Sequence, residues 1–312
     1  MRRDLPALAI LALLAAAPFI GFGEGHVLTL LARGMIFGVA AVSLALIVGG
    51  AGLVSLGHAA MLGFGAYAVV ILDKAGITDA AIVLPVAIAA AAGFALVTGV
   101  IAIRTTGVHF IMITLAFGQM AFFTAASLSA YGGDDGYTLY GRTEVLGRRL
   151  MENRLAFHFI CLGALALTWL VCRLVLASRF GRVLRASREN DLRVQAVGLA
   201  PYGYRLTGYV IAGALGGLAG FLLANSAEFV APAYLSWQRS GELLFMVILG
   251  GLGGLHGAML GALVFVVLEE YLAHALGEHW RLVFGPMLIL SVLFLRGGLA
   301  GLPGTLRGLR RG

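Results

Sequence analysis

Charged residues are scarce in this chain, and lysine is almost missing. Only 12% of the 312 residues are Asp, Glu, Lys or Arg, and Lys74 is the single lysine among 22 basic residues. A soluble domain of average composition carries about 25% charged residues. Because 60% of the chain is hydrophobic and its mean hydropathy is +0.96, the composition excludes an ordinary soluble protein and predicts a chain that crosses a membrane repeatedly.

The sequence also lacks the common motifs for nucleotide binding and hydrolysis. It contains no G-x-x-x-x-G-K-[ST] segment, and its one lysine follows Asp73 rather than glycine, so ATP phosphates have no P-loop to bind. No H-E-x-x-H or G-x-S-x-G motif is present either. We therefore expect no enzyme activity, no catalytic residue, no metal site and no bound cofactor. If ATP drives this protein, a different polypeptide hydrolyses it.

Cysteine is equally rare. The two cysteines, Cys161 and Cys172, are 11 residues apart in one predicted helix, which separates them by about 16 Å along the helix axis. A disulfide cannot bridge that distance, and the spacing matches no metal-binding motif. Both are predicted to be packing residues.

Long apolar runs predict an all-α, polytopic transmembrane helix bundle that forms one domain over residues 1–312, because about 20 apolar residues cross a bilayer. For the first run, a cleaved signal peptide ending near Ala15 to Ala17 is the alternative. In the second run, the side chain of Arg33 is expected to snorkel to the headgroups. The count is nine or ten spans, depending on whether the interrupted run crosses once or twice. The expected spans are residues 5–22, 28–48, a run that ends at Leu72, 80–103, 108–129, 156–176, 206–223, an interrupted run over 243–275, and 282–302.

A polar interval from Ser178 to Arg205 fixes the expected orientation. It holds six arginines but only two acidic residues, Glu189 and Asp191, and short basic loops stay on the cytoplasmic side of a membrane. With ten spans, this rule places both termini in the cytosol. The net charge of +7 is therefore interpreted as topology rather than as nucleic-acid binding.

Inside this interval, Ser187 to Val197 is predicted to form one short helix. Ser187 is placed to cap its start, and Gly198 is placed to end it. Leu192 and Leu199 fall on a common face of this helix. Two uses stay open: the helix docks onto a soluble partner, or it lies on anionic lipid at the membrane surface.

Two glycine-rich segments interrupt apolar runs, one over residues 49–65 and one over 250–257. The sequence HAAMLG at 58–63 is echoed by HGAMLG at 256–261. Paired broken segments in two halves of a chain point to a transport path, and tight packing of helices through small residues is the alternative. The candidate path residues are Ser55, Gly57, His58, Gly250, Gly251, Gly254 and His256.

Blocks of sequence along nearly the whole chain resemble one family. They include SLGHAA at 55–60, FIMITLAFGQ at 110–119, REN at 188–190, GGLGGLHG at 250–257 and GLAGL at 298–302. In order and spacing these blocks resemble the branched-chain amino acid permease subunits of ABC importers. The resemblance is closest to the M-type subunit.

The resemblance implies a permease of the bacterial inner membrane that imports leucine, isoleucine, valine or related amino acids. A second permease of the H-type would complete the path, two ABC ATPase subunits would use ATP, and a periplasmic binding protein would deliver the substrate. The short helix of the polar interval would be a cytoplasmic coupling helix that seats on the ATPase. On this basis coupling is assigned to Arg188, Glu189, Asn190, Arg193, Ala196 and Gly198.

Several positions depart from the family pattern. Gln195, Arg205 and His256 stand where Ala, Lys and Trp are frequent, so substrate selectivity does not transfer directly. One alternative is an ABC permease for a related solute such as urea or a short amide. Another is an ion-coupled secondary transporter, which needs paired charges in mid-span; Glu269 and Glu270 are interpreted as interfacial instead.

Overall fold

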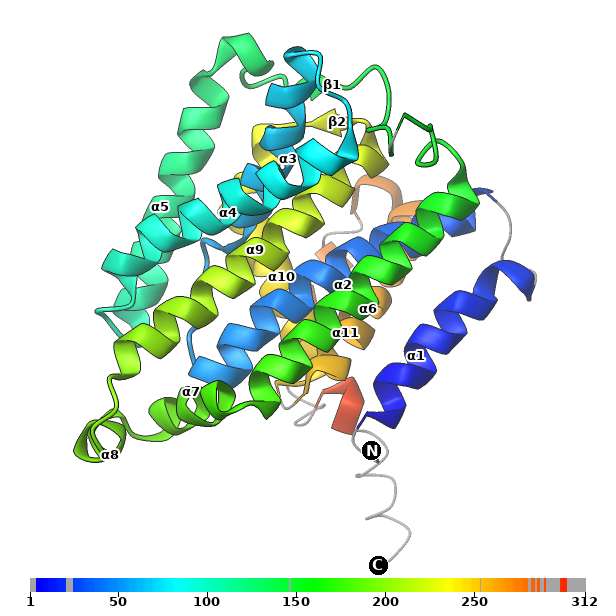
Figure 1. Cartoon of the computed structure of the whole chain (residues 1–312). Coiled ribbons are helices and arrows are strands. Elements are labelled where there is room, and N and C mark those ends of the chain that lie inside the picture. Colours follow the sequence, from blue (N-terminus) through cyan, green and yellow to red (C-terminus); the bar gives the residue numbers. More distant parts are fainter. Residues whose placement is uncertain are drawn as a thin grey trace, which may run out of the picture.

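Helices dominate the computed structural model of the chain, which describes residues 4–20, 25–145, 147–252, 254–279, 282–283, 285–286, 289 and 298–301. The long helices extend between two ends of the molecule (Figure 1). In chain order the elements are α1 (Leu5–Ala16), η1 (Ala17–Phe19), α2 (Gly25–Ala51), α3 (His58–Lys74), α4 (Ala80–Ala102), α5 (Val108–Ser127), η2 (Ser129–Tyr131), β1 (Tyr137–Thr138), α6 (Arg154–Ala177), α7 (Arg179–Glu189), α8 (Asp191–Ala196), α9 (Pro201–Ala227), β2 (Phe229–Val230), η3 (Pro232–Leu235), α10 (Trp237–Gly250), α11 (Leu255–Leu276), η4 (Gly277–His279) and η5 (Leu299–Gly301).

Six of the described helices, α2, α4, α5, α6, α9 and α11, are long and apolar enough to cross a bilayer. Helices α1, α3 and α10 are shorter, with 12, 17 and 14 residues. The predicted multi-pass helical bundle is confirmed. Most of the expected last span, residues 282–302, lies outside the described residues, so the count of nine to ten spans stays a prediction.

Helix α2 occupies the centre of the bundle. Every residue from Gly34 to Val48 is buried, and α6, α9, α10 and α11 all pack against it. A helix that is apolar on all sides has no face to present to water, so it is stable where other helices surround it. The surrounding helices therefore take their positions from α2.

Helix α9 packs closely against α3 and α4 through its glycines. A Cβ atom added to Gly217 would stand 2.7 Å from the carbonyl oxygen of Ala87, and one added to Gly220 would overlap the backbone of Leu62. Small residues let helix backbones approach in a membrane, where van der Waals packing replaces the hydrophobic effect as the source of association. Gly217 and Gly220 thus form a small-residue face of α9.

The predicted helix breaks occur at both glycine-rich segments. Helix α2 ends at Ala51, Gly52 has a φ of +71°, and residues 52–57 are not helical. Between α10 and α11, Gly251 has a φ of +107°. Glycine adopts such values without the steric penalty that other residues meet. Because residues 59–62 are fully buried, helix α3 begins inside the bundle rather than at its surface.

The end of the bundle opposite α7 and α8 carries the long connection between η2 and α6, which we call the outer loop (Figure 1). Strand β1 pairs antiparallel with β2. Arg142 in this loop forms an ion pair with Glu228, with a distance of 2.8 Å from Nε to Oε1, and the backbone N–H of Thr143 donates to Asn225 Oδ1 at 2.7 Å. These contacts tie the loop to the last turns of α9. We refer to the two ends as the β1–β2 end and the α7–α8 end.

Candidate functional site

The polar interval folds into two short helices that project from one end of the bundle (Figure 1). We call residues 179–198, which contain α7 and α8, the basic knob. The side chain of Ser178 accepts a hydrogen bond from the N–H of Gly181 at 3.3 Å, and that of Asn190 accepts one from Arg193 at 3.1 Å. Both are favoured N-cap residues because they satisfy free N–H groups of a first helical turn.

The expected single helix from Ser187 to Val197 is wrong. Ser187 lies within α7, and its hydroxyl donates to the carbonyl oxygen of Leu184 at 2.8 Å instead of capping a helix. Asn190 is extended, with a φ of −159°, and begins α8. The predicted end of the helix is confirmed by Gly198, which has a φ of +81°. The capping signal was present in the sequence, but it belonged to Asn190.

The basic knob is fixed to the bundle at two points. Arg205 on α9 is only 8% exposed, and its guanidinium donates to the Ser187 carbonyl oxygen at 2.7 Å and to Asp191 Oδ1 at 2.8 Å. Arg188 donates from Nη1 to the carbonyl oxygen of Gly49 at 2.8 Å. The knob is therefore joined to α9 through Arg205 and to the end of the central helix α2 through Arg188.

The outer surface of the knob combines positive charge with apolar side chains. The six predicted coupling residues, 188, 189, 190, 193, 196 and 198, are all exposed. Leu192 is 76% exposed and Val197 is 74% exposed. Val194 in the same helix is buried and lies on the side of α8 that faces α7. Exposed apolar residues rimmed by polar ones are typical of a surface that binds another molecule.

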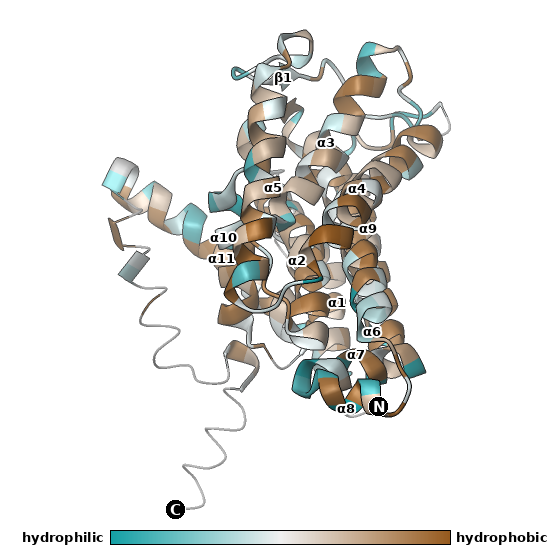
Figure 2. Cartoon of the chain, turned by 90° about the vertical axis from the view of Figure 1, so that its left-hand side faces the viewer, coloured by the Kyte–Doolittle hydropathy of each residue, from teal (hydrophilic) through white to brown (hydrophobic). Residues whose placement is uncertain are grey.

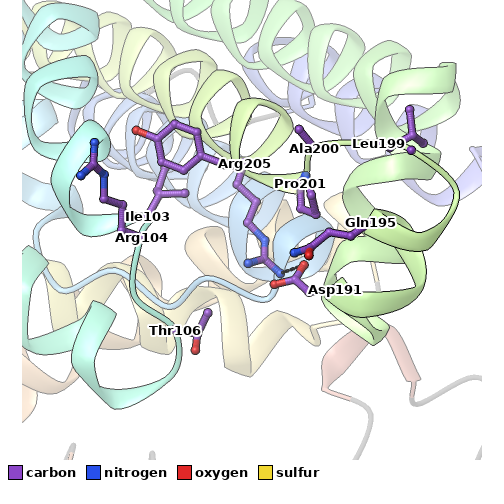
Figure 3. Close-up of a pocket in the computed structure, with 11 residues that line it drawn as sticks. Ile103, Arg104, Thr106, Asp191, Gln195, Leu199, Ala200, Pro201 and Arg205 are labelled. Atoms are coloured by element: carbon purple, nitrogen blue, oxygen red, sulfur yellow. Dashed lines mark hydrogen bonds and ion pairs between the residues drawn. The ribbon is translucent and has the colours of Figure 1, made fainter.

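A pocket of about 650 Å³ lies between α8, the start of α9 and the turn that joins α4 to α5. Figure 3 shows Arg205 and Asp191 meeting in it, with Gln195 beside them and Arg104 on the facing turn. A second pocket of about 320 Å³ separates α7 from α8 and includes Arg182 and Arg193. The knob thus has a hollow on each side of α8.

Three of the predicted path residues, Ser55, Gly57 and His58, meet at the break between α2 and α3. His58 Nε2 lies 2.8 Å from the hydroxyl of Ser43 on α2, and the ring is fully buried. The N–H of Ala59 donates to the hydroxyl of Ser240 on α10 at 3.0 Å. The first turns of two short helices, α3 and α10, therefore meet inside the bundle.

The other predicted path residues lie elsewhere. Gly250 and Gly251 pack against the backbone of Gly257 and Gly298, and a Cβ atom on Gly49 would stand 3.5 Å from the carbonyl oxygen of Leu252. Gly49 is also the residue that accepts from Arg188. The second glycine-rich segment, with Gly254 and His256, is therefore next to the base of the knob, and it meets the first segment at Gly49.

The family model described as "Branched-chain amino acid transport system / permease component" matches residues 26–293. The chain belongs to this family. The permease is 27% identical to the high-affinity branched-chain amino acid transport system permease protein LivM of Escherichia coli, over 96% of this chain and 75% of that one. No solved structure matches the permease.

Two relatives from Methanocaldococcus jannaschii match shorter parts of the permease. The probable branched-chain amino acid transport permease protein LivM is 31% identical over 45% of this chain and 43% of that one. The corresponding LivH protein is 34% identical over 38% of each chain. The match to E. coli LivM covers nearly the whole permease, whereas the LivH match does not, so the permease is LivM-like.

Sequence reasoning missed the residue that holds the knob of this permease. Arg205 was noted only as one basic residue among several and as a departure from the family pattern. Arg205 can hold the knob because it stands 14 residues after Asp191, its partner. It lies in the first turns of a helix that returns into the membrane. A basic residue there, with an acid in the preceding short helix, was the available signal.

Proposed function

We propose that this permease is the membrane subunit of an ATP-driven ABC importer for branched-chain or other hydrophobic amino acids. The family and the similarity to the high-affinity branched-chain amino acid permease LivM of E. coli support this assignment. A second permease of the H-type completes the translocation path, and a periplasmic binding protein delivers the substrate. The membrane is the bacterial inner membrane.

The observation that carries the proposal is the exposed surface of the basic knob on a fixed base. Leu192 and Val197 are open to solvent, whereas Arg205 and Arg188 join the knob to α9 and α2. A partner that binds the exposed surface therefore moves two central helices with it. Because this chain has no P-loop, the partner is an ABC ATPase subunit, and ATP stays bound to that partner.

Transport proceeds by alternating access, in which ATP binding and hydrolysis move the two knobs and rock the helices around a central path. Ser55, Gly57 and His58 flank that path, where the first turns of α3 and α10 meet. Helix N-termini carry partial positive charge that favours a substrate carboxylate. The second glycine-rich segment lies at the knob side of the path, between the base of the knob and the membrane helices, with Gly250, Gly251, Gly254 and His256.

The α7–α8 end faces the cytosol in this proposal. Arg173, Arg188 and the other arginines of this end fit the positive-inside rule. Asp4 near the N-terminus pairs with Arg173, at 2.7 Å from Oδ2 to Nη2, and Gly298 packs against Gly251. Both ends of the described chain therefore lie on the cytosolic side.

Reconstitution tests the function. Vesicles that contain this permease, its H-type companion, both ATPases and the binding protein should accumulate labelled leucine only when ATP is supplied. Vesicles without the ATPases should accumulate none. Uptake by the permease alone under an ion gradient would instead support a secondary transporter, and ATP-driven uptake of urea or a short amide in place of leucine would change the substrate class.

A further inference from the structure

An ion-pair network lies within the membrane portion of the bundle, on a face shared by α2, α10 and α11. Arg33 Nη2 is 3.3 Å from Glu269 Oε2, and Arg33 Nη1 is 3.6 Å from Glu270 Oε2. Arg239 and Glu242 form a second ion pair, one turn apart on α10. We call these five residues the charged face. Arg33, which the sequence predicts to snorkel to the headgroups, pairs with carboxylates of α11.

One aromatic ring joins the two halves of the charged face. The guanidinium carbon of Arg33 lies 5.9 Å from the centroid of the Phe37 ring, and that of Arg239 lies 5.3 Å from it. Stacking on an aromatic face attracts a guanidinium and fixes its plane. The two arginines are therefore held near each other despite their like charge, by Phe37 between them and by three carboxylates around them.

The charged face lies at membrane depth. Arg33 is eight residues from the start of α2 and 18 from its end, which is about 12 Å and about 27 Å along the helix. Figure 2 shows hydrophilic colour beside the α10 and α11 labels, between the two polar ends of the bundle. A hydrocarbon core is about 30 Å thick, so the backbone of Arg33 lies inside the core when α2 spans it.

The side chains of the charged face are also partly exposed. Arg33 is 35% exposed, Glu242 34% and Glu270 37%, counted on the side chains. Charged groups within a membrane face a protein interior or a water-filled cavity, because lipid cannot solvate them. The outward faces of α4 and α6 differ: Val97 and Leu167 are more than half exposed and suit lipid. The charged face therefore meets a water-filled cavity or another protein chain rather than lipid.

We infer that the charged face lines the water-filled translocation path and binds the charged groups of a zwitterionic amino acid. Arg239 binds the substrate carboxylate, and Glu242 with Glu270 binds its ammonium group. The exchange leaves the net charge of the site unchanged, because the substrate brings one charge of each sign. Phe245, one turn beyond Glu242 and 41% exposed, offers apolar surface to an aliphatic side chain. This inference rests on the proposed import of amino acids.

Cysteine accessibility tests the water-filled path in the complete transporter. Phe245→Cys and Val267→Cys place thiols beside the charged face, and Leu167→Cys on α6 is the control that faces lipid. The native Cys161 and Cys172 are fully buried, so they give little background. A membrane-impermeant thiol reagent should label the first two variants at least 10-fold faster than the control, since thiolates form in water. Equal rates at all three positions would overturn the inference.

Charge substitutions test substrate binding. Glu242→Gln and Arg239→Gln should each lower leucine uptake at least 10-fold while ATP hydrolysis stimulated by the binding protein stays within about twofold of wild type. Glu152→Gln, in an exposed ion pair of the outer loop, is the matched control and should leave uptake unchanged. If uptake and hydrolysis fall together in both variants, the pair is structural and the inference fails.

Exchanging the two residues of the α10 ion pair separates a role in substrate binding from a structural role. Arg239→Glu combined with Glu242→Arg keeps an ion pair on α10 but reverses the charges that the substrate meets. Uptake should stay at least 10-fold reduced in the swapped protein; recovery to the wild-type rate would assign the pair to structure alone. Loss of ATP-driven leucine uptake by the wild-type complex would refute the proposed function, which is a different result from a defect confined to the variants.

Discussion

The guanidinium of Arg205 lies 2.8 Å from the carboxylate of Asp191 and joins the first turns of α9 to the first turn of α8. Arg205 is buried, and its other hydrogen bonds go to the backbone carbonyl and the hydroxyl of Ser187 in α7. One side chain therefore holds both helices of the basic knob to a membrane-crossing helix. The geometry suits the transfer of motion, because a displacement of the knob acts on α9 through short polar contacts.

Replacement of Arg205 by glutamine should detach the knob. Asp191 and the Ser187 carbonyl lose their partner, and the loss of a hydrogen bond to a charged group costs about 1.5–3 kcal/mol. We expect normal amounts of protein in the membrane, leucine uptake reduced at least 10-fold, and faster cleavage of residues 179–198 by protease. Arg193→Gln, at an exposed position of the same knob, should cleave at the wild-type rate. Equal cleavage in both variants would contradict the anchoring role.

Leu192→Arg should weaken binding of the ATPase without unfolding the permease. Leu192 is exposed, so the substitution changes the free energy of unfolding by about 0.5 kcal/mol or less. We expect the fraction of ATPase that copurifies with the permease to fall about 10-fold. Tyr140→Arg is the control, because Tyr140 is exposed in the outer loop. Wild-type copurification of the Leu192 variant would show that the partner binds elsewhere.

Gly198→Ala should change the end of the knob through the backbone. Gly198 has a φ of +81° and no atom within 4 Å of an added Cβ, so the strain comes from conformation alone, about 1–2 kcal/mol. We expect partial uncoupling: ATP hydrolysis continues while uptake falls about threefold to 10-fold. Glu189→Arg, which reverses a charge on the knob, should likewise lower uptake while ATP hydrolysis continues. Full uptake by both variants would remove these residues from the coupling surface.

Gly217→Leu should separate α9 from α4. The added side chain would meet the Ala87 carbonyl oxygen and the Ala91 Cβ, both within 2.7 Å of the first added atom, and such overpacking costs about 1–3 kcal/mol. We expect a lower temperature of thermal unfolding in detergent. Gly93→Ala, where no atom lies within 4 Å, is the matched control and should leave that temperature unchanged or raise it. A similar shift in both variants would contradict the close contact.

The sequence predicted the class of the fold well but the knob only in part. Apolar runs and the glycine-rich segments gave the multi-pass bundle and both helix breaks, because these features depend on neighbouring residues. Part of the polar interval was correctly predicted to be helical, and the helix was correctly predicted to end at Gly198. Its division at Asn190 was missed, because Ser187 and Asn190 are both good N-caps and only packing decides which one starts a helix.

The candidate path shows the same limit. His58 and His256 occupy matching positions in two similar segments, yet His58 is buried against Ser43 whereas the segment of His256 lies near Gly49 at the base of the knob. Local sequence similarity carries no information about which helices surround each segment.

By itself, the sequence determined that this protein lies in a membrane, which end is basic, where its helices break, and to which family it belongs. Each of these properties depends on composition or on residues close together in the chain. Only the tertiary structure decided that Arg205 holds the knob and that Arg33 pairs with Glu269, 236 positions away. The physical reason is that an ion pair needs its two groups within about 4 Å, and the packing of helices around α2 alone brings residues so far apart in the chain to that distance.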